Sequence, residues 1–162
     1  MSTTTTLTPD VVAGAPDFHP ASAPDYLPES QMRRLQLQRL RAVVRCCYDH
    51  VELFRRRMQE RSLTPDDIVE LEDIRHLPFT VKTDLRDTYP FGLFASPTSE
   101  IVRLHASSGT TGKPIVVAYT REDLDIWAQV MVRSFAACGL NSGDIVQNAY
   151  GYGLFTGGLG AH

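Results

Sequence analysis

Two short β-type segments enclose a turn of hydroxyl and glycine residues, and this arrangement constrains the fold more than any other feature of the chain. The segments are residues 101–105 and 115–119, whose β-branched and apolar side chains predict extended strands. Between them, residues 107–113 hold four hydroxyl side chains, two glycines and one lysine. Because such residues favour turns, the simplest structure for this region is a β-hairpin.

Helical periodicity dominates the residues on either side of the turn. Apolar side chains recur at helical spacing within residues 40–58 and again within residues 124–138. Thr120 and Asp123 have the spacing of a capping box at the start of the second helix. We expect residues 144–149 to form a third strand. A helix followed by a strand predicts an α/β fold.

The first helical region is basic and the next stretch is acidic. Residues 31–61 contain nine arginines and three acidic residues, whereas residues 66–73 contain five acidic residues and no basic ones. A basic helical face can bind nucleic acid or acidic lipid, but a charged face opposite an apolar stripe is usually just solvated. We therefore expect the two charge excesses to neutralise each other across a helical subdomain.

Length and charge narrow the function classes. The chain has 162 residues, with 16 Lys and Arg against 19 Asp and Glu, so its net charge is −3. This slight acidity gives no reason to expect a nucleic-acid partner. No apolar run approaches the roughly 20 residues that cross a bilayer, so no membrane partner is expected. The three cysteines lack metal-site spacing, so no metal site is predicted. Three thiols do not form a disulfide framework either, and a reducing cytoplasm fits this.

The first 28 residues differ from the rest of the chain. They contain no Lys or Arg and five of the ten prolines. A secretory signal needs a positively charged start and an apolar segment, and neither is present. Because few large apolar groups are available to offset the entropy of ordering, we expect a flexible leader over residues 1–29.

The hydroxyl-rich turn has the composition of a polyphosphate site. Glycines allow backbone N–H groups to converge on an anion, and Lys113 adds a mobile positive charge. A Walker A loop is excluded, because Ser107 stands where its first glycine belongs and Pro114 replaces its final Ser or Thr. Two alternatives remain at this point: a hairpin turn without a ligand, and a catalytic serine at Ser107 or Ser108, although the GxSxG pattern is not met.

The segment Ser-Ser-Gly-Thr-Thr-Gly-Lys-Pro at residues 107–114 resembles the phosphate-binding signature of adenylate-forming enzymes. Residues 77–86, 89–94 and 148–162 narrow the resemblance to the phenylacetate-CoA ligases, and the similarity begins at about residue 30. The resemblance implies an α/β fold that is incomplete here. A helical subdomain over residues 30–98 would precede the start of the large AMP-binding domain over residues 99–162.

The resemblance also implies an activity. Members of this family are AMP-forming acid–thiol ligases that use ATP and Mg²⁺ to convert phenylacetate to phenylacetyl-adenylate, and then transfer the acyl group to coenzyme A. The implied partners are a small aryl carboxylate, ATP and coenzyme A, and the implied state is a cytoplasmic homodimer. The alternatives are another aryl- or acyl-CoA ligase, and a non-catalytic module that binds phosphate or another protein.

Site residues follow from the resemblance position by position. The residues that match the ATP-phosphate loop are Ser107, Ser108, Gly109, Thr110, Thr111, Gly112 and Lys113. The residues that match the aryl pocket are Tyr150, Gly151, Phe155 and Gly157. The adenine, ribose, Mg²⁺ and coenzyme A sites are expected beyond His162. The catalytic residues are therefore not assigned, and this chain is expected to be inactive by itself.

Overall fold

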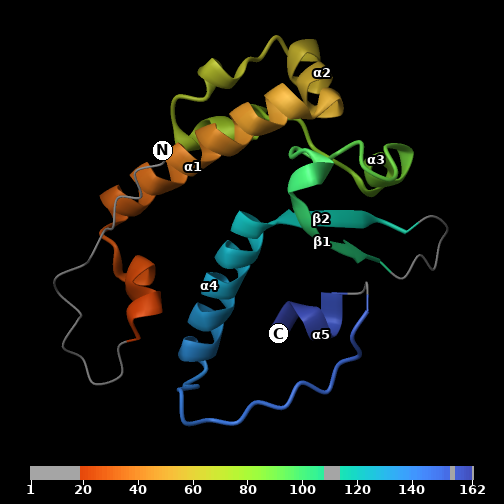
Figure 1. Ribbon diagram of the computed structural model, residues 1–162. Coiled ribbons are helices and arrows are strands. Elements are labelled where there is room, and N and C mark those ends of the chain that lie inside the picture. Colours follow the sequence, from red (N-terminus) through yellow and green to blue (C-terminus); the bar gives the residue numbers. More distant parts are fainter. Residues whose placement is uncertain (1–18, 108–113, 154–155, 162) are drawn as a thin grey trace.

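The computed structural model describes residues 19–107, 114–153 and 156–161, and it arranges helices around one small β-hairpin (Figure 1). The elements in chain order are η1 (Pro20–Tyr26), α1 (Glu29–His50), α2 (Glu52–Glu60), η2 (Pro65–Asp67), η3 (Leu71–His76), α3 (Lys82–Asp87), η4 (Thr98–Glu100), β1 (Ile101–Ala106), β2 (Val116–Thr120), α4 (Arg121–Ala137) and α5 (Thr156–Ala161), where η marks a 3-10 helix.

The helical subdomain is built on a small apolar core. Val44 of α1, Met58 of α2 and Ile68 are each at most 2% exposed. Leu37, Leu40, Tyr48, Phe54, Leu63 and Leu77 pack around them. The predicted helical stripe over residues 40–58 is divided at Val51, where α1 ends and α2 begins, so that both helices turn apolar side chains to the same core.

The acidic stretch neutralises the basic helix, as the charge pattern predicts. Arg33 and Arg45 of α1 form ion pairs with Glu72 and Asp66. Arg41 donates from Nε to the Ile68 carbonyl at 2.7 Å, which ties the same helix to the backbone of that stretch. Exposed ion pairs each stabilise a fold by at most about 1 kcal/mol, so their main effect here is to orient residues 66–73 along α1.

The expected hairpin is present. β1 and β2 pair antiparallel, with His105 opposite Val117 and Ala106 opposite Val116. Thr120 then starts α4 with a reciprocal cap, because its hydroxyl accepts from the Asp123 N–H at 3.2 Å and Asp123 Oδ2 accepts from the Thr120 N–H at 2.9 Å. These contacts confirm the predicted capping box and fix the direction in which α4 leaves the sheet.

The prediction of a third strand over residues 144–149 is wrong. This segment has no regular structure, and the Ile145 side chain is 99% exposed. A strand needs a neighbouring backbone to satisfy its N–H and C=O groups. Among the described residues, β1 and β2 pair only with each other, so this segment runs as an extended connection from α4 to α5.

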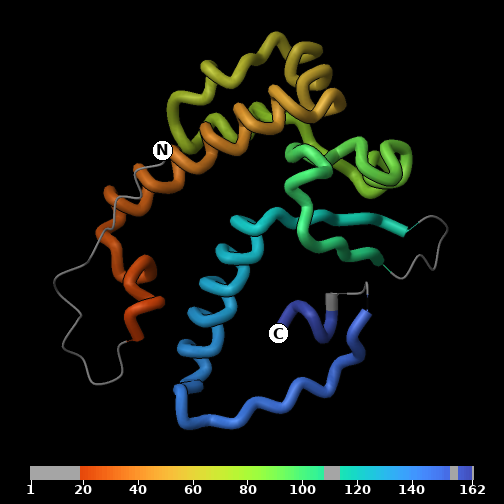
Figure 2. Tube along the Cα trace, in the orientation of Figure 1, coloured from red at the N-terminus to blue at the C-terminus, as the bar shows by residue number. Residues whose placement is uncertain are grey.

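Part of the predicted leader is helical and lies beside α4 (Figure 2). Asp25 of η1 forms an ion pair with Arg133 in the C-terminal half of α4. The boundary at residue 29 stays a prediction, and residues 1–18 lie outside the described part of the chain.

Candidate functional site

The base of the hydroxyl-rich loop is closed by Ser107 and Ile115. The Ser107 N–H donates to the Ile115 carbonyl at 2.9 Å, and the Ser107 hydroxyl oxygen accepts from the Ile115 N–H at 2.9 Å. The hydroxyl thus occupies a place in the ladder that a backbone carbonyl would otherwise take. Its own O–H remains able to donate, because accepting one bond does not use the proton.

The structure describes one residue of the predicted phosphate loop, and the contact of that residue with ATP stays a prediction. Ser107 is described and exposed. Ser108, Gly109, Thr110, Thr111, Gly112 and Lys113 lie outside the described residues, and their contact with ATP stays a prediction. What the structure adds is the position of both ends of the loop on the β1–β2 hairpin.

A cluster of three rings lies under this hairpin. His105 of β1 is 1% exposed, and its ring centroid lies 5.2 Å from that of Tyr119 and 5.5 Å from that of Trp127. Burial, and to a smaller extent the charge of Arg103, lowers the pKa of His105, which favours the neutral imidazole. Ser107 is exposed while His105 is buried among rings, so the contacts of these two residues give no support to a serine–histidine pair.

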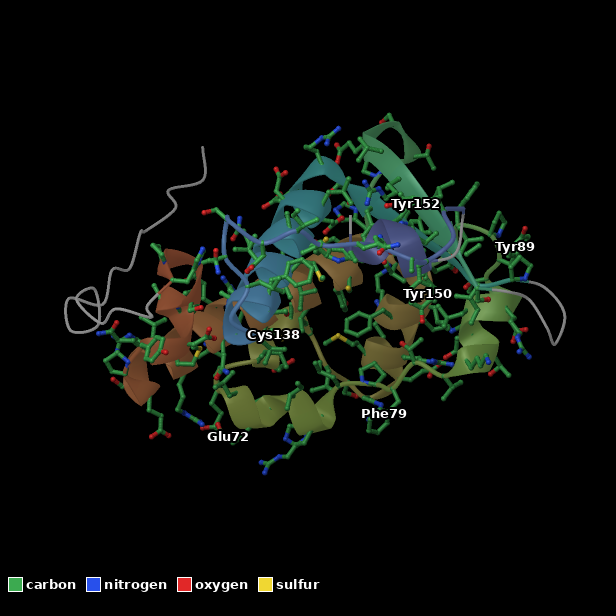
Figure 3. All side chains as sticks on the ribbon, turned by 90° about the horizontal axis from the view of Figure 1, so that it is seen from below. Glu72, Phe79, Tyr89, Cys138, Tyr150 and Tyr152 are labelled. Carbon is green, nitrogen blue, oxygen red and sulfur yellow. The ribbon has the colours of Figure 1, made fainter. Side chains whose placement is uncertain are left out.

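The predicted aryl-pocket residues lie on and before α5. Tyr150 is 68% exposed, Gly151 is exposed and Gly157 is half-buried, whereas Phe155 lies outside the described residues. Figure 3 shows Tyr150 in the half of the molecule that holds the hairpin and α5. A large exposed ring beside small residues can stack on an aromatic ligand.

Asn148 organises this segment, and sequence reasoning missed it. Its Nδ2 donates to the Gly158 carbonyl at 2.8 Å and to the Tyr152 hydroxyl at 3.3 Å. Its Oδ1 accepts from the Tyr150 N–H at 3.1 Å. The Asn148 amide thus holds residues 148–152 against α5. A lone Asn gives no pattern in a single sequence, so no signal pointed to it.

Gly158 was also missed, and the structure shows why glycine stands there. It is buried in α5, and a Cβ at this position would lie 2.9 Å from the Gly151 carbonyl oxygen and 3.1 Å from the Tyr150 carbonyl oxygen. α5 and residues 150–151 therefore approach each other so closely at Gly158 that no larger residue fits there without a shift of the backbone. The abundance of glycine near the end of the chain is the signal that could have pointed to this approach.

One side chain of α4 and one of β1 also form hydrogen bonds with α5. Trp127 of α4 donates from Nε1 to the Gly160 carbonyl at 3.0 Å. Arg103 of β1 donates from Nη1 to the Leu159 carbonyl at 3.5 Å. Between β1, α4 and α5 lies a cavity of about 350 Å³. Its apolar lining includes Leu124, Trp127, Met131, Phe135 and Leu159. The four α4 residues of this lining are half-buried because they face the cavity, whereas Val130 of the predicted stripe is 48% exposed. No residue of α4 is fully buried.

Within residues 19–107, 114–153 and 156–161, no three His, Cys, Asp or Glu side chains are grouped so that they could hold a metal ion. We therefore assign no residue to Mg²⁺. In the described part of the chain, none of the helices has the length and apolar character needed to cross a bilayer.

Comparison with known proteins identifies relatives. The chain is 57% identical over 131 residues to the phenylacetate-coenzyme A ligase of Pseudomonas putida and 54% identical over 136 residues to that of Thermus thermophilus. These alignments cover 81% and 84% of this chain. The chain spans about 30% of the length of these relatives. No family model matches the chain.

Solved structures agree with the sequence relatives. A 2-hydroxyisobutyryl-CoA ligase in complex with 2-HIB-AMP and CoA, in the thioesterification state, superposes with a TM-score of 0.76 and 32% identity. The match covers 83% of this chain and 30% of that one. The same ligase in the postadenylation state with 2-HIB-AMP gives a TM-score of 0.74. The chain is therefore a homologue of the phenylacetate-CoA ligases, and it has the fold of the N-terminal part of an adenylate-forming ligase.

Proposed function

We propose that these residues form the front part of an AMP-forming phenylacetate-CoA ligase, in which the loop over residues 107–113 binds the phosphates of ATP. The observation that carries the proposal is the identity of 54–57% to phenylacetate-coenzyme A ligases over more than four fifths of the chain. The hairpin geometry supports it, because Ser107 and Ile115 fix both ends of a loop rich in hydrogen-bond donors.

The chemistry has two steps. A carboxylate is a poor electrophile, so a carboxylate oxygen of phenylacetate first attacks the α-phosphorus of ATP, and pyrophosphate leaves. The sulfur of coenzyme A then attacks the acyl carbon of the adenylate, the thiol proton is lost, and AMP leaves. Mg²⁺, expected from the resemblance, would neutralise phosphate charge when bound.

The proposed role of the loop is positioning and charge stabilisation. Backbone N–H groups at Gly109 and Gly112, the hydroxyls of Thr110 and Thr111, and the ammonium of Lys113 are donors that suit phosphate oxygens. Holding the β- and γ-phosphates keeps the α-phosphorus in line with the attacking oxygen, and stabilises the charge of the departing pyrophosphate.

The proposed aryl pocket uses Tyr150 and Phe155 as aromatic walls, with Gly151 and Gly157 leaving space for the ring. The exposure of Tyr150 supports this role, because its face is available to a ligand. The hydrogen bonds of Asn148 limit how far the segment can move, which suits a preformed pocket. The proposal also includes a cytoplasmic homodimer, on the strength of the resemblance.

Product analysis of the complete polypeptide that carries these residues tests the function. We expect phenylacetate, ATP and coenzyme A to give phenylacetyl-CoA, AMP and pyrophosphate in equal amounts. A higher kcat/KM for 2-hydroxyisobutyrate or benzoate than for phenylacetate would overturn the proposed substrate. Binding of ATP without acyl-CoA formation from any of these acids would overturn the ligase proposal and favour a non-catalytic module.

A further inference from the structure

Three side chains from three places in the chain hold consecutive carbonyls of α5. Asn148 binds the Gly158 carbonyl, Arg103 binds the Leu159 carbonyl and Trp127 binds the Gly160 carbonyl. Their donor–acceptor distances are 2.8, 3.5 and 3.0 Å, so the bonds from Asn148 and Trp127 are the shorter two. These bonds fix α5 relative to β1 and α4.

Arg103 links β1 alone to α5, whereas Trp127 also packs its ring on side chains of both strands of the hairpin. Its ring lies 5.5 Å from that of His105 and 4.9 Å from that of Tyr119, so it touches both strands of the hairpin. His105 stands two residues before Ser107, where the phosphate loop begins. Trp127 therefore joins both strands at the base of the proposed phosphate loop to α5, the helix that carries Gly157 of the proposed aryl pocket.

We infer that Trp127 is a positioning residue. It holds residues 150–157, which carry the proposed aryl pocket, at a fixed place relative to the hairpin that carries the phosphate loop. The inference rests on the proposed function. Attack on the α-phosphorus requires the acid and ATP to meet in one geometry. An acid pocket that is already held in place on the hairpin binds the acid without first paying the entropy of ordering the pocket. A rigid link between the two binding segments satisfies that requirement without touching either ligand.

Replacement of Trp127 by Phe isolates the hydrogen bond. Trp127→Phe keeps an aromatic ring against His105 and Tyr119 but removes the N–H that reaches Gly160. In the complete polypeptide, we expect the KM for phenylacetate to rise between about 2-fold and 10-fold, which is the range for losing one such bond. The KM for ATP should stay unchanged, because the loop remains attached to an intact hairpin.

Phe135→Leu is the matched control. Phe135 lines the same cavity, so this variant removes ring volume there without removing a donor to α5. It should leave both KM values unchanged. A merely structural role for Trp127 predicts instead that both variants lower the melting temperature alike and that any change in KM affects ATP and acid together.

Asn148→Asp provides a second, independent variant if Trp127→Phe does not fold. It removes the donor to the Gly158 carbonyl and should also raise the KM for phenylacetate alone. If the unmodified protein makes no acyl-CoA, the proposed function fails. If the unmodified protein is active while Trp127→Phe and Asn148→Asp leave the KM for phenylacetate unchanged, the positioning inference fails and the proposed function stands.

Discussion

Arg57 of α2 donates two parallel hydrogen bonds to the carboxylate of Asp84 in α3, from Nη1 to Oδ2 at 2.6 Å and from Nη2 to Oδ1 at 2.8 Å. The same carboxylate accepts from the Val81 N–H at 2.8 Å, which caps the start of α3. Arg57 Nη1 also donates to the Phe79 carbonyl at 2.9 Å. Asp84 is buried and the Arg57 side chain is 27% exposed, and this pair joins the helical subdomain to the segment that leads to the hairpin.

The Arg57–Asp84 pair predicts a loss of stability in acid. The hydrogen bonds from Arg57, followed by that from Val81, lower the pKa of Asp84 from 3.8 to about 2. Because the folded pKa lies below the unfolded one, the stabilisation is complete above pH 4 and is lost as pH falls toward 2. Asp84→Asn should lower the free energy of unfolding at pH 7, measured with urea. It should also make this free energy depend less on pH below pH 4.

Asp66→Asn is the control for that experiment. Asp66 pairs with Arg45, but its side chain is 83% exposed, and exposed pairs add little to stability. The account of the joint is contradicted if the two variants shift the urea midpoint equally.

Met58→Ala should cause a large loss of stability. Met58 is fully buried at the centre of the helical core, between Val44 and Ile68. Deleting such a side chain leaves a cavity and costs about 2–5 kcal/mol of unfolding free energy. Val43→Ala on α1 is the control, since Val43 is 55% exposed and should change stability by no more than about 0.5 kcal/mol. Chemical denaturation measures both values.

The buried imidazole of His105 predicts a second pH effect, near neutrality. Burial lowers the pKa of His105 below 6.5, so the unfolded chain binds the proton more readily than the folded one. Stability from this residue is complete above pH 6.5 and falls as pH decreases toward the folded pKa. His105→Phe, which keeps a ring in the cluster, should weaken the pH dependence of the melting temperature below 6.5.

Gly158→Ala tests the close approach between α5 and the aromatic segment. The added methyl would lie 2.9 Å from the Gly151 carbonyl oxygen, so the segment must move. We expect a cost of about 1–3 kcal/mol and a higher KM for phenylacetate. Gly153→Ala is the matched control, because nothing lies within 4 Å of a Cβ there. Equal effects of the two substitutions on KM would contradict this account.

Local patterns predicted much of the fold. The β-type side chains of residues 101–105 and the capping box of Thr120 and Asp123 depend on neighbours in sequence. The charge pattern also predicted that residues 66–73 would neutralise α1, because complementary charge excesses that follow each other in the chain can pair across a short turn.

Long-range contacts were not predictable in the same way. Residues 144–149 have the composition of a strand, yet a strand forms only when another backbone pairs with it. Asn148, Gly158 and Trp127 act on groups that are brought to them by the fold, and a single sequence does not show which carbonyl a side chain will reach. The family resemblance supplied the loop and pocket residues, but it did not supply the contacts that hold them.

The most direct test of the account is phenylacetate-dependent exchange of labelled pyrophosphate into ATP by the complete polypeptide. We predict exchange that requires phenylacetate and that falls by roughly 100-fold when Thr110 and Thr111 are both replaced by Val. Thr98→Val, in η4 before the hairpin, should leave the exchange rate unchanged. Absence of exchange, or an equal rate in the Thr110→Val/Thr111→Val protein, would contradict the claim that this loop binds the phosphates of ATP.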